Sequence, residues 1–391
     1  MVASILKRDL ASHRVRALQR GKTMRQILIA LGFCALAAPA FAAPVPMDSP
    51  RWELLGAETR VETFQGQQAL YLRGAIATLA DANFDTGVIE FDMAITSNAQ
   101  SFPGIYFRGV DENNYEHFYI RPHQSGNPDS MQYTPVINGN TAWQIHSQYN
   151  ARMRFRVNEW FHVRLEVAED SARIFVDSNE PSMIVYDLKR DRAAGYIQLR
   201  GSLGGMYVAN FSVTPGSPAA APAEPVPENI PAGLVRTWQV SAPMAEADAF
   251  AAASANRLNN VSWTALPVET NGLANLARVG VRTNEAPTVL TRVSVRSDRA
   301  RSVPMRFGFS DKVRVYVNGT LLYSGDDTQN SRDYRFLGTI GWWDALQLPL
   351  RRGNNEIVFA VSEGGGGNAI GGGGWSATAA FPEMAGLTVA P

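Results

Sequence analysis

The chain has 391 residues, a formal net charge of zero and a single cysteine. Its length is enough for two or three domains that each bury a core. With 45% hydrophobic and 18% charged residues, the composition is that of a globular protein and excludes a disordered one. The absence of net basic charge argues against a nucleic-acid partner. One cysteine excludes an intramolecular disulfide and any multi-cysteine metal centre.

The N-terminus has the features of an export signal. A basic start at Met24-Arg25 is followed by an apolar run over residues 27–38 and by Ala40-Phe41-Ala42. This order of basic, apolar and small residues predicts a signal peptide within residues 1–42, cleaved after Ala42. Met24 is an alternative start of the chain. We therefore expect an exported protein, either periplasmic or extracellular.

Two further expectations concern the same segment. A lipoprotein signal would need Cys34 at the modification site, but the bulky Phe33 precedes it where a small residue is expected. No stretch reaches the roughly 20 apolar residues of a membrane-spanning helix, so we expect no membrane span. Because residues 1–42 carry seven basic residues and one acidic residue, the remaining chain has a net charge of −6. It keeps only two lysines, Lys189 and Lys312.

A proline- and alanine-rich segment divides the rest of the chain. Residues 214–234 contain six prolines, a composition that favours extended polyproline II and cannot form a core. We expect a linker here, between one domain over residues 44–213 and another over residues 235–391. Each is of ordinary domain size.

Both domains are predicted to be all-β. Short runs rich in β-branched and aromatic residues alternate with period two and are separated by Gly, Asn, Asp and Pro. Asn318-Gly319 between two such runs is a strong hairpin signal. One short alanine-rich helix is expected over residues 244–255, and a flexible glycine-rich loop over residues 364–374. The fold class is therefore two antiparallel β-sandwich (jelly-roll) domains. The expected strands cover residues 88–95, 105–108, 115–121, 161–167, 172–176, 197–199, 289–295, 305–309, 313–317, 321–323 and 357–361.

The densest group of polar and aromatic residues lies between residues 111 and 146. Strand alternation places Tyr115, His117, Tyr119 and Arg121 on one face of a strand. Aromatic rings that stack on sugar C–H groups, flanked by hydrogen-bonding side chains, form a plausible glycan platform. Any single residue of the group is more simply explained by cross-strand packing, but the whole group is not. The candidate glycan-binding residues are Tyr106, Arg108, Tyr115, Tyr119, Arg121, His123 and Trp143.

A catalytic alternative rests on three residues. The alternation turns Glu116 toward the apolar layer, where a carboxylate is either paired with an arginine or protonated. A raised pKa would suit Glu116 to general acid catalysis. His117 and His146 are the other candidates, as bases of a lyase. The Glu90-x-Asp92 pair is more simply explained as ordinary sheet chemistry, because Ala94 follows where a third carboxylate would be needed.

No metal or cofactor is expected. His117 and His123 lie six residues apart, which matches no common zinc spacing. Asp111, Asn113 and Asn114 could contribute oxygens to a structural calcium ion, although they are too few for a complete cage. The sequence has no nucleophile elbow, no P-loop and no dinucleotide fingerprint.

Residues 52–213 resemble the concanavalin A-like (LamG-type) jelly rolls, including the bacterial 3-keto-disaccharide hydrolase family. Residues 84–95, 102–109, 114–123, 160–167 and 172–177 carry the resemblance. It implies a carbohydrate on the concave face of the sheet, with Arg108, Glu116, His117, Tyr119 and Arg121 at the site. Gln144-Ile145-His146 is also similar to the Q-I-H element of jelly-roll alginate lyases, in which the histidine assists β-elimination from a uronate.

Residues 235–382 resemble a galactose-binding-like sandwich, through residues 310–325 and 346–363. In that domain Trp342, Trp343 and Trp375 are either stacking rings or, more simply, core residues. The leading hypothesis is an exported carbohydrate-binding protein whose second sandwich is an accessory domain. The alternatives are a glycoside hydrolase or polysaccharide lyase, and a non-catalytic structural protein of the cell envelope.

Overall fold

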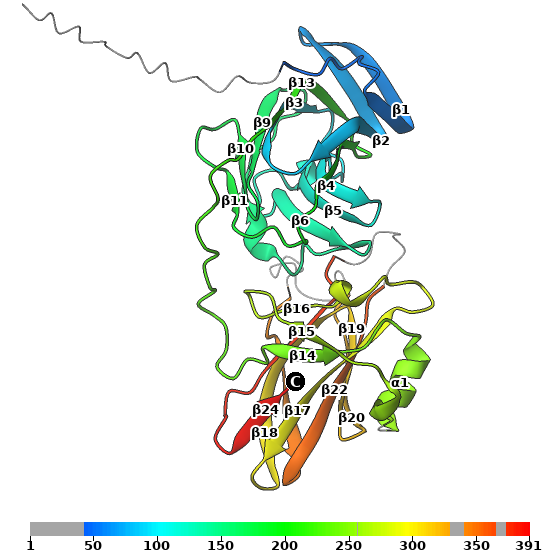
Figure 1. Ribbon diagram of the computed structural model, residues 1–391, viewed down its shortest axis with the longest axis vertical. Coiled ribbons are helices and arrows are strands. Elements are labelled where there is room, and N and C mark those ends of the chain that lie inside the picture. Colours follow the sequence, from blue (N-terminus) through cyan, green and yellow to red (C-terminus); the bar gives the residue numbers. More distant parts are fainter. Residues whose placement is uncertain (1–42, 256, 329–339, 365–372) are drawn as a thin grey trace, which may run out of the picture. The chain divides into compact units, whose positions relative to one another are not determined.

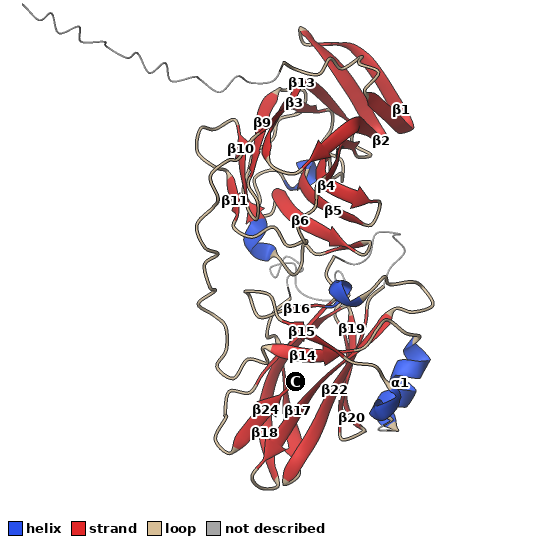
Figure 2. Ribbon diagram, viewed as in Figure 1, coloured by secondary structure: helices blue, strands red, loops and turns tan. Residues whose placement is uncertain are grey.

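We describe a computed structural model of the protein (Figure 1). It describes residues 43–255, 257–328, 340–364 and 373–391. The predicted signal peptide lies outside these residues, as does most of the predicted glycine-rich loop. Strands account for most of the regular structure, and Figure 2 shows the helix α1 (Glu246–Ser254) and short 3-10 turns beside them. The predicted all-β class is confirmed. None of the helices in the described ranges has the length and apolar character needed to cross a membrane.

The first sandwich is a single curled antiparallel sheet that forms two layers. The strands of one layer follow the order β11-β10-β9-β3-β13, and those of the other the order β12-β4-β5-β6-β7. The strands are β1 (Trp52–Phe64), β2 (Gln67–Phe84), β3 (Gly87–Ile95), β4 (Gly104–Asp111), β5 (Asn114–Ile120), β6 (Met131–Ile137), β7 (Asn140–Thr141), β8 (Asn150–Ala151), β9 (Phe161–Val167), β10 (Ala172–Val176), β11 (Met183–Val185), β12 (Gly195–Gly201) and β13 (Met206–Pro215).

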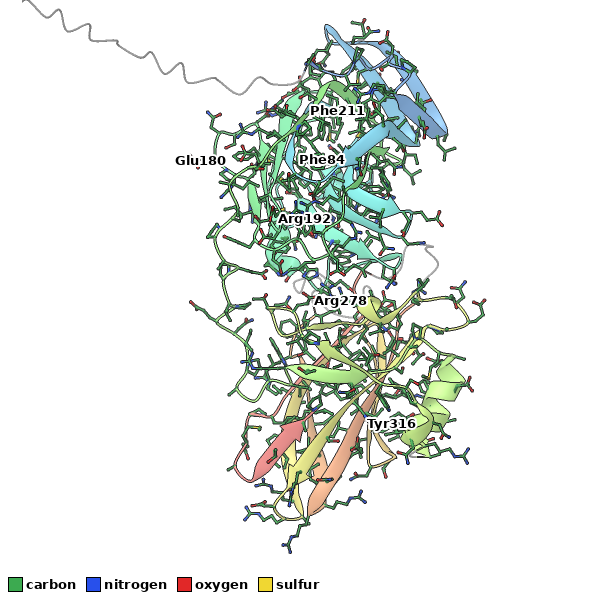
Figure 3. All side chains as sticks on the ribbon, in the orientation of Figure 1. Phe84, Glu180, Arg192, Phe211, Arg278 and Tyr316 are labelled. Atoms are coloured by element: carbon green, nitrogen blue, oxygen red, sulfur yellow. The ribbon has the colours of Figure 1, made fainter. Side chains whose placement is uncertain are left out.

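The long strand β2 joins the two layers. Residues 70–72 of β2 pair with β13, and residues 75–84 pair with β12. The change of partner falls at Gly74, whose φ of 55° is accessible to glycine without a steric penalty. The sheet therefore divides at this point, and its two layers bury one shared core. Phe84 and Phe211 belong to that core (Figure 3).

Part of the predicted linker is hydrogen-bonded to the first sandwich. The Arg173 guanidinium donates to the Ala219 and Ala220 carbonyls. The Glu224 carboxylate accepts from Lys189 Nζ at 2.8 Å and from the Tyr149 hydroxyl at 2.7 Å. Burial acts in the opposite direction, but these hydrogen bonds lower the pKa of Glu224 to about 2. The segment around Glu224 is therefore anchored by charge, while the predicted domain boundaries stay a prediction.

The second sandwich has two antiparallel sheets. One follows the order β15-β14-β17-β22-β19-β20 with β24 paired to β17, and the other follows β16-β23-β18-β21. The strands are β14 (Thr237–Val240), β15 (Thr264–Pro267), β16 (Ala274–Asn275), β17 (Thr288–Ser297), β18 (Arg301–Ser310), β19 (Lys312–Val317), β20 (Thr320–Asp326), β21 (Asp344–Leu350), β22 (Gly353–Ser362), β23 (Ser376–Ala380) and β24 (Leu387–Ala390).

Two local predictions for this sandwich are confirmed. Asn318 and Gly319 turn the chain between β19 and β20, with φ values of 51° and 82° that suit Asn-Gly. The helix α1 packs its Ala249 and Ala253 against the sheet next to Tyr316 (Figure 3). Trp375 is fully buried and donates to the Val361 carbonyl, whereas Trp343 is 45% exposed.

Candidate functional site

Four neighbouring strands of the first sandwich, β12, β4, β5 and β6, position the candidate site (Figure 1). Along β5, Phe118 and Ile120 face the shared core, and Glu116 is buried on the same side. The intervening residues Tyr115, His117 and Tyr119 face the other way, because successive side chains of a strand alternate. This alternation was predicted from the sequence and is observed.

Six rings on that face form one contiguous group, which we call the aromatic row. Tyr106 stacks on Tyr115 with ring centroids 4.1 Å apart and meets His117 edge-on at 4.5 Å. His117 in turn stacks on Tyr119 at 4.6 Å. Phe102 continues the row, 5.9 Å from Tyr119 and 5.4 Å from His123. The aromatic row consists of Phe102, Tyr106, Tyr115, His117, Tyr119 and His123.

The exposure of these rings determines how they could contact a ligand. Tyr106, His117 and Tyr119 are each at most 7% exposed, and each is in ring contact with a neighbour in the row. Tyr115 and Phe102, near opposite ends of the row, are partly exposed. A sugar could therefore stack on Tyr115 or Phe102, whereas the rings between them offer edges and polar atoms.

Polar side chains extend the row toward β6 and β8. The Tyr119 hydroxyl donates to Gln132 Oε1 at 2.6 Å, and Gln132 Nε2 donates to Asn150 Oδ1 at 2.7 Å. Just beyond β5, Arg121 forms an ion pair with the buried carboxylate of Asp129. The network fixes the orientation of the Tyr119 ring and leaves Asn150 partly exposed at its end.

His117 is the polar centre of the row. Its Nε2 is buried and has no hydrogen-bond partner within the part of the chain that the structure describes. Burial lowers the pKa of His117 well below its usual value, and the charge of Arg200 lowers it further. The ring is therefore neutral at physiological pH. A buried polar atom without a partner is costly and calls for an explanation, such as a ligand or water that reaches it.

Arg108 departs from the predicted arrangement. Alternation predicts it beside Tyr106, but the pairing of β4 with β5 shifts after Phe107, and Arg108 has a φ of 50°. A bulge of this kind redirects the following side chain. The Arg108 guanidinium donates to the backbone carbonyls of Asp85, Ala168 and Glu169 at 2.6, 2.7 and 3.0 Å. These partners and the Asp85 carboxylate, 3.2 Å away, occupy its donors.

Glu116, a catalytic candidate, lies on the opposite face from His117. It is buried, and the Tyr133 hydroxyl donates to its Oε2 at 2.6 Å. Burial raises the pKa of Glu116 above its usual value, although Tyr133, Arg190 and Arg108 act against this rise. Because adjacent residues of a strand point to opposite faces, Glu116 and His117 cannot reach the same bond of a substrate.

The remaining candidates are not part of the row. His146 is fully buried, and neither ring nitrogen has a hydrogen-bond partner among the described residues. Burial lowers the pKa of His146 well below its usual value, with the charge of Lys189 acting in the same direction. Trp143, three residues earlier, is partly exposed. Neither residue has a ring contact with the aromatic row.

The predicted calcium oxygens form a turn. Asp111 Oδ1 accepts from the backbone N–H of Asn113 at 2.7 Å and from Asn114 Nδ2 at 3.0 Å. Within the described ranges, no group of three or more His, Cys, Asp or Glu side chains is arranged to hold a metal ion.

Three residues near the row were missed in the sequence analysis. Gln198 and Arg200 come from β12, and Gln132 comes from β6. Gln198 pairs in register with Tyr106 and donates to the Thr78 hydroxyl at 2.8 Å. The signal was present in the alternation of β12, in which Ile197 and Leu199 are core residues. Only the sheet order shows that β12 lies next to β4.

The comparisons with known proteins return solved structures but no family. Neither a protein-family model nor a curated protein matches the sequence. The structural neighbours are jelly-roll glucanases, carbohydrate-binding modules and galectin-like proteins. The specific LamG-type likeness therefore stays a prediction.

Three neighbours illustrate the range. A carbohydrate-binding module of family 66 from Bacillus subtilis is 16% identical with a TM-score of 0.33, and the match covers 41% of this chain and 93% of the module. A β-glucanase from Bacillus licheniformis is 12% identical with a TM-score of 0.31, covering 43% and 94%. The galectin LEC-6 from Caenorhabditis elegans is 14% identical with a TM-score of 0.27, covering 40% and 95%.

Proposed function

We propose that the protein binds carbohydrate at the aromatic row of the first sandwich, without catalysis, and that it does so as an exported protein. The observation that supports this most directly is the composition of one sheet face. Six aromatic rings lie in contact there, beside partly exposed amide and guanidinium groups and the unpartnered His117 Nε2. Apolar ring surface together with a few fixed polar groups is what a sugar site requires.

Each part of the face has a distinct role in this proposal. The partly exposed rings of Tyr115 and Phe102 stack on the C–H face of a sugar. The partly exposed amide of Asn150 exchanges hydrogen bonds with hydroxyl groups, and the buried His117 Nε2 does so once a bound sugar displaces the rings that enclose it. Binding is favoured over catalysis because Glu116 faces the core and His146 is fully buried. The second sandwich remains an accessory domain in this proposal.

The test is a glycan array probed with the purified full chain, followed by titration of each glycan that binds. Tyr115→Ala removes a partly exposed ring, so we expect its affinity for these glycans to fall at least about tenfold, or about 1.4 kcal/mol. The matched control is Tyr186→Ala, which removes a half-buried tyrosine outside the row. The control should bind as the unchanged chain does.

Two outcomes would contradict the proposal. One is a folded full chain that binds no glycan on the array. The other is binding that Tyr115→Ala and Tyr186→Ala weaken equally, which would place the site away from the row. Release of new reducing ends or unsaturated uronates from a bound glycan would show that the protein is an enzyme and not a non-catalytic binding protein.

A further inference from the structure

Arg200 places a positive charge beside the aromatic row. On β12 it alternates with the core residue Leu199, so it faces the same side as Gln198 and Tyr106. Its guanidinium carbon lies 5.9 Å from the centre of the Tyr106 ring, and its side chain is partly exposed. Burial raises the pKa of Tyr115 and Tyr119 and lowers that of His117, and the charge of Arg200 acts to lower all three. One cation therefore acts on four rings of the row.

Glycine at position 104 lets β4 and β5 approach closely beside this cation. Arg200 pairs with Gly104 of β4, and Gly104 pairs with Tyr119 of β5. A Cβ atom at position 104 would lie 2.2 Å from the Phe118 carbonyl oxygen, so only glycine fits there. Because Gly104 is the β4 residue that pairs with both Arg200 and Tyr119, no β4 side chain lies between these two residues.

Among the described residues, the charge of Arg200 has no carboxylate partner. No carboxylate forms an ion pair with Arg200 within 4.0 Å across the ranges that the structure describes. The other arginine at the row, Arg121, is paired with Asp129, and the carboxylate of β5, Glu116, faces the core. An arginine left unpaired next to a recognition surface offers a planar fork of donors that matches a carboxylate.

We propose that the sugar bound at the aromatic row is acidic, and that Arg200 binds its carboxylate as the residue that selects it. The inference rests on the proposed function and narrows its ligand to sugars that carry a uronate group. In this arrangement the carboxylate lies against the partly exposed side chain of Arg200, beside Tyr106. Tyr115 contacts the apolar face of a neighbouring sugar unit.

The experiment compares matched pairs of glycans. The probes are oligosaccharides of galacturonate, mannuronate, guluronate and glucuronate, each beside its carboxyl-reduced counterpart, which keeps the ring but loses the charge. Binding to the full chain is measured at low and at physiological salt. We expect the acidic member of at least one pair to bind at least about tenfold more tightly, because a charge-assisted hydrogen bond is stronger than a neutral one. The preference should shrink as salt screens the charge.

Three variants assign the preference to Arg200. Arg200→Gln keeps a hydrogen-bonding side chain but removes the charge, so the acidic and reduced members should then bind within about twofold of each other. Arg200→Lys keeps the charge but loses the planar fork, so it should retain part of the preference. The matched control is Arg164→Gln. Arg164 lies over the Phe175 ring at 3.9 Å on the other layer, and its loss should leave the preference unchanged.

The outcomes separate this inference from the proposed function. If the acidic and the reduced member of every pair bind equally, and Tyr115→Ala weakens the binding of both, the ligand is not selected for its carboxylate. The aromatic row would then still be the binding site. A preference for the acid that survives in Arg200→Gln would overturn the role of Arg200. Failure of all these probes, while another glycan on the array binds, would overturn the acidic ligand and leave the proposed function. Failure of these probes and of the array together would overturn the proposed function itself.

Discussion

The two faces of strand β5 use polar residues in opposite ways. Toward the core, Glu116 receives a hydrogen bond from Tyr133, and Arg108 of the neighbouring strand β4 is held by three backbone carbonyls. On the other face, His117 Nε2 has no partner and Arg200 has no carboxylate within the described residues. Glu116 and Arg108 are thus bonded within the protein, while His117 Nε2 and the Arg200 guanidinium keep capacity to bond a ligand.

This difference shows which buried polar residues are structural. An arginine or glutamate that is enclosed in a core must be satisfied by the fold, because an unpaired buried charge is strongly destabilising. The same residue types at a ligand-binding surface can lack a hydrogen-bond or ion-pair partner in the free protein, because the bound ligand supplies that partner. Substitutions on the core-facing side should therefore lower the stability of the fold, and substitutions on the side of the aromatic row should lower the affinity for a glycan.

Arg108→Ala should have the largest effect on stability. It leaves the carbonyls of Asp85, Ala168 and Glu169 without their donor and leaves the Asp85 carboxylate with Arg192 alone. We expect a loss of about 3–5 kcal/mol in the free energy of unfolding, because three carbonyls lose a charge-assisted hydrogen bond and a large buried side chain leaves a cavity. Chemical denaturation of the full chain measures it. Arg108→Lys, which keeps the charge, should lose less. A loss under about 1 kcal/mol would contradict the structural role.

The sequence contained enough to predict the face of the row but not all of its members. Alternation along residues 115–119 is unbroken, so it correctly predicted which side chains point together. It gave the wrong face for Arg108 because a bulge after Phe107 interrupts the period. Gly109, directly after Arg108, is a residue type that often marks a bulge, but this signal was not used. The two-residue alternation of side chains does not itself show where a bulge interrupts it.

Long-range pairing explains the other omissions. Arg200 lies 80 or more residues from the rings it approaches, and only the order β12-β4-β5 brings them together. The long strand β2 was not predicted, because its middle is rich in alanine and threonine and lacks aromatic residues. His146 illustrates the reverse case. Its Gln-Ile-His context resembles a catalytic element, but its complete burial depends on packing that the sequence does not show.

Glu116→Gln tests the core face through pH. The pKa of Glu116 is raised above its ordinary value of 4.5, so the folded state binds this proton more tightly than the unfolded state does. The contribution of Glu116 to the free energy of unfolding must therefore fall as the pH rises above about 4.5, by at most about 1.4 kcal/mol per pH unit. Glutamine does not titrate. Denaturation between pH 5 and pH 8 should show the original chain losing stability relative to Glu116→Gln.

A control variant sharpens this measurement. Tyr133→Phe removes the hydroxyl that donates to Glu116 at 2.6 Å, and that hydrogen bond opposes the rise of the pKa. The pH dependence should therefore extend to higher pH in Tyr133→Phe. If the original chain instead gained stability relative to Glu116→Gln as the pH rises, the assigned direction of the pKa shift would be wrong.

His117→Phe should have the smallest effect on stability and a large effect on binding. The substitution keeps a ring between Tyr106 and Tyr119 and removes a buried nitrogen that has no partner among the described residues. Its free energy of unfolding should change by less than about 1 kcal/mol, because removal of an unsatisfied polar atom offsets the strain of a larger ring. Affinity for a bound glycan should fall at least about tenfold. A loss of stability as large as that of Arg108→Ala, with binding intact, would mean that both faces of β5 are structural, and the contrast between them would be lost.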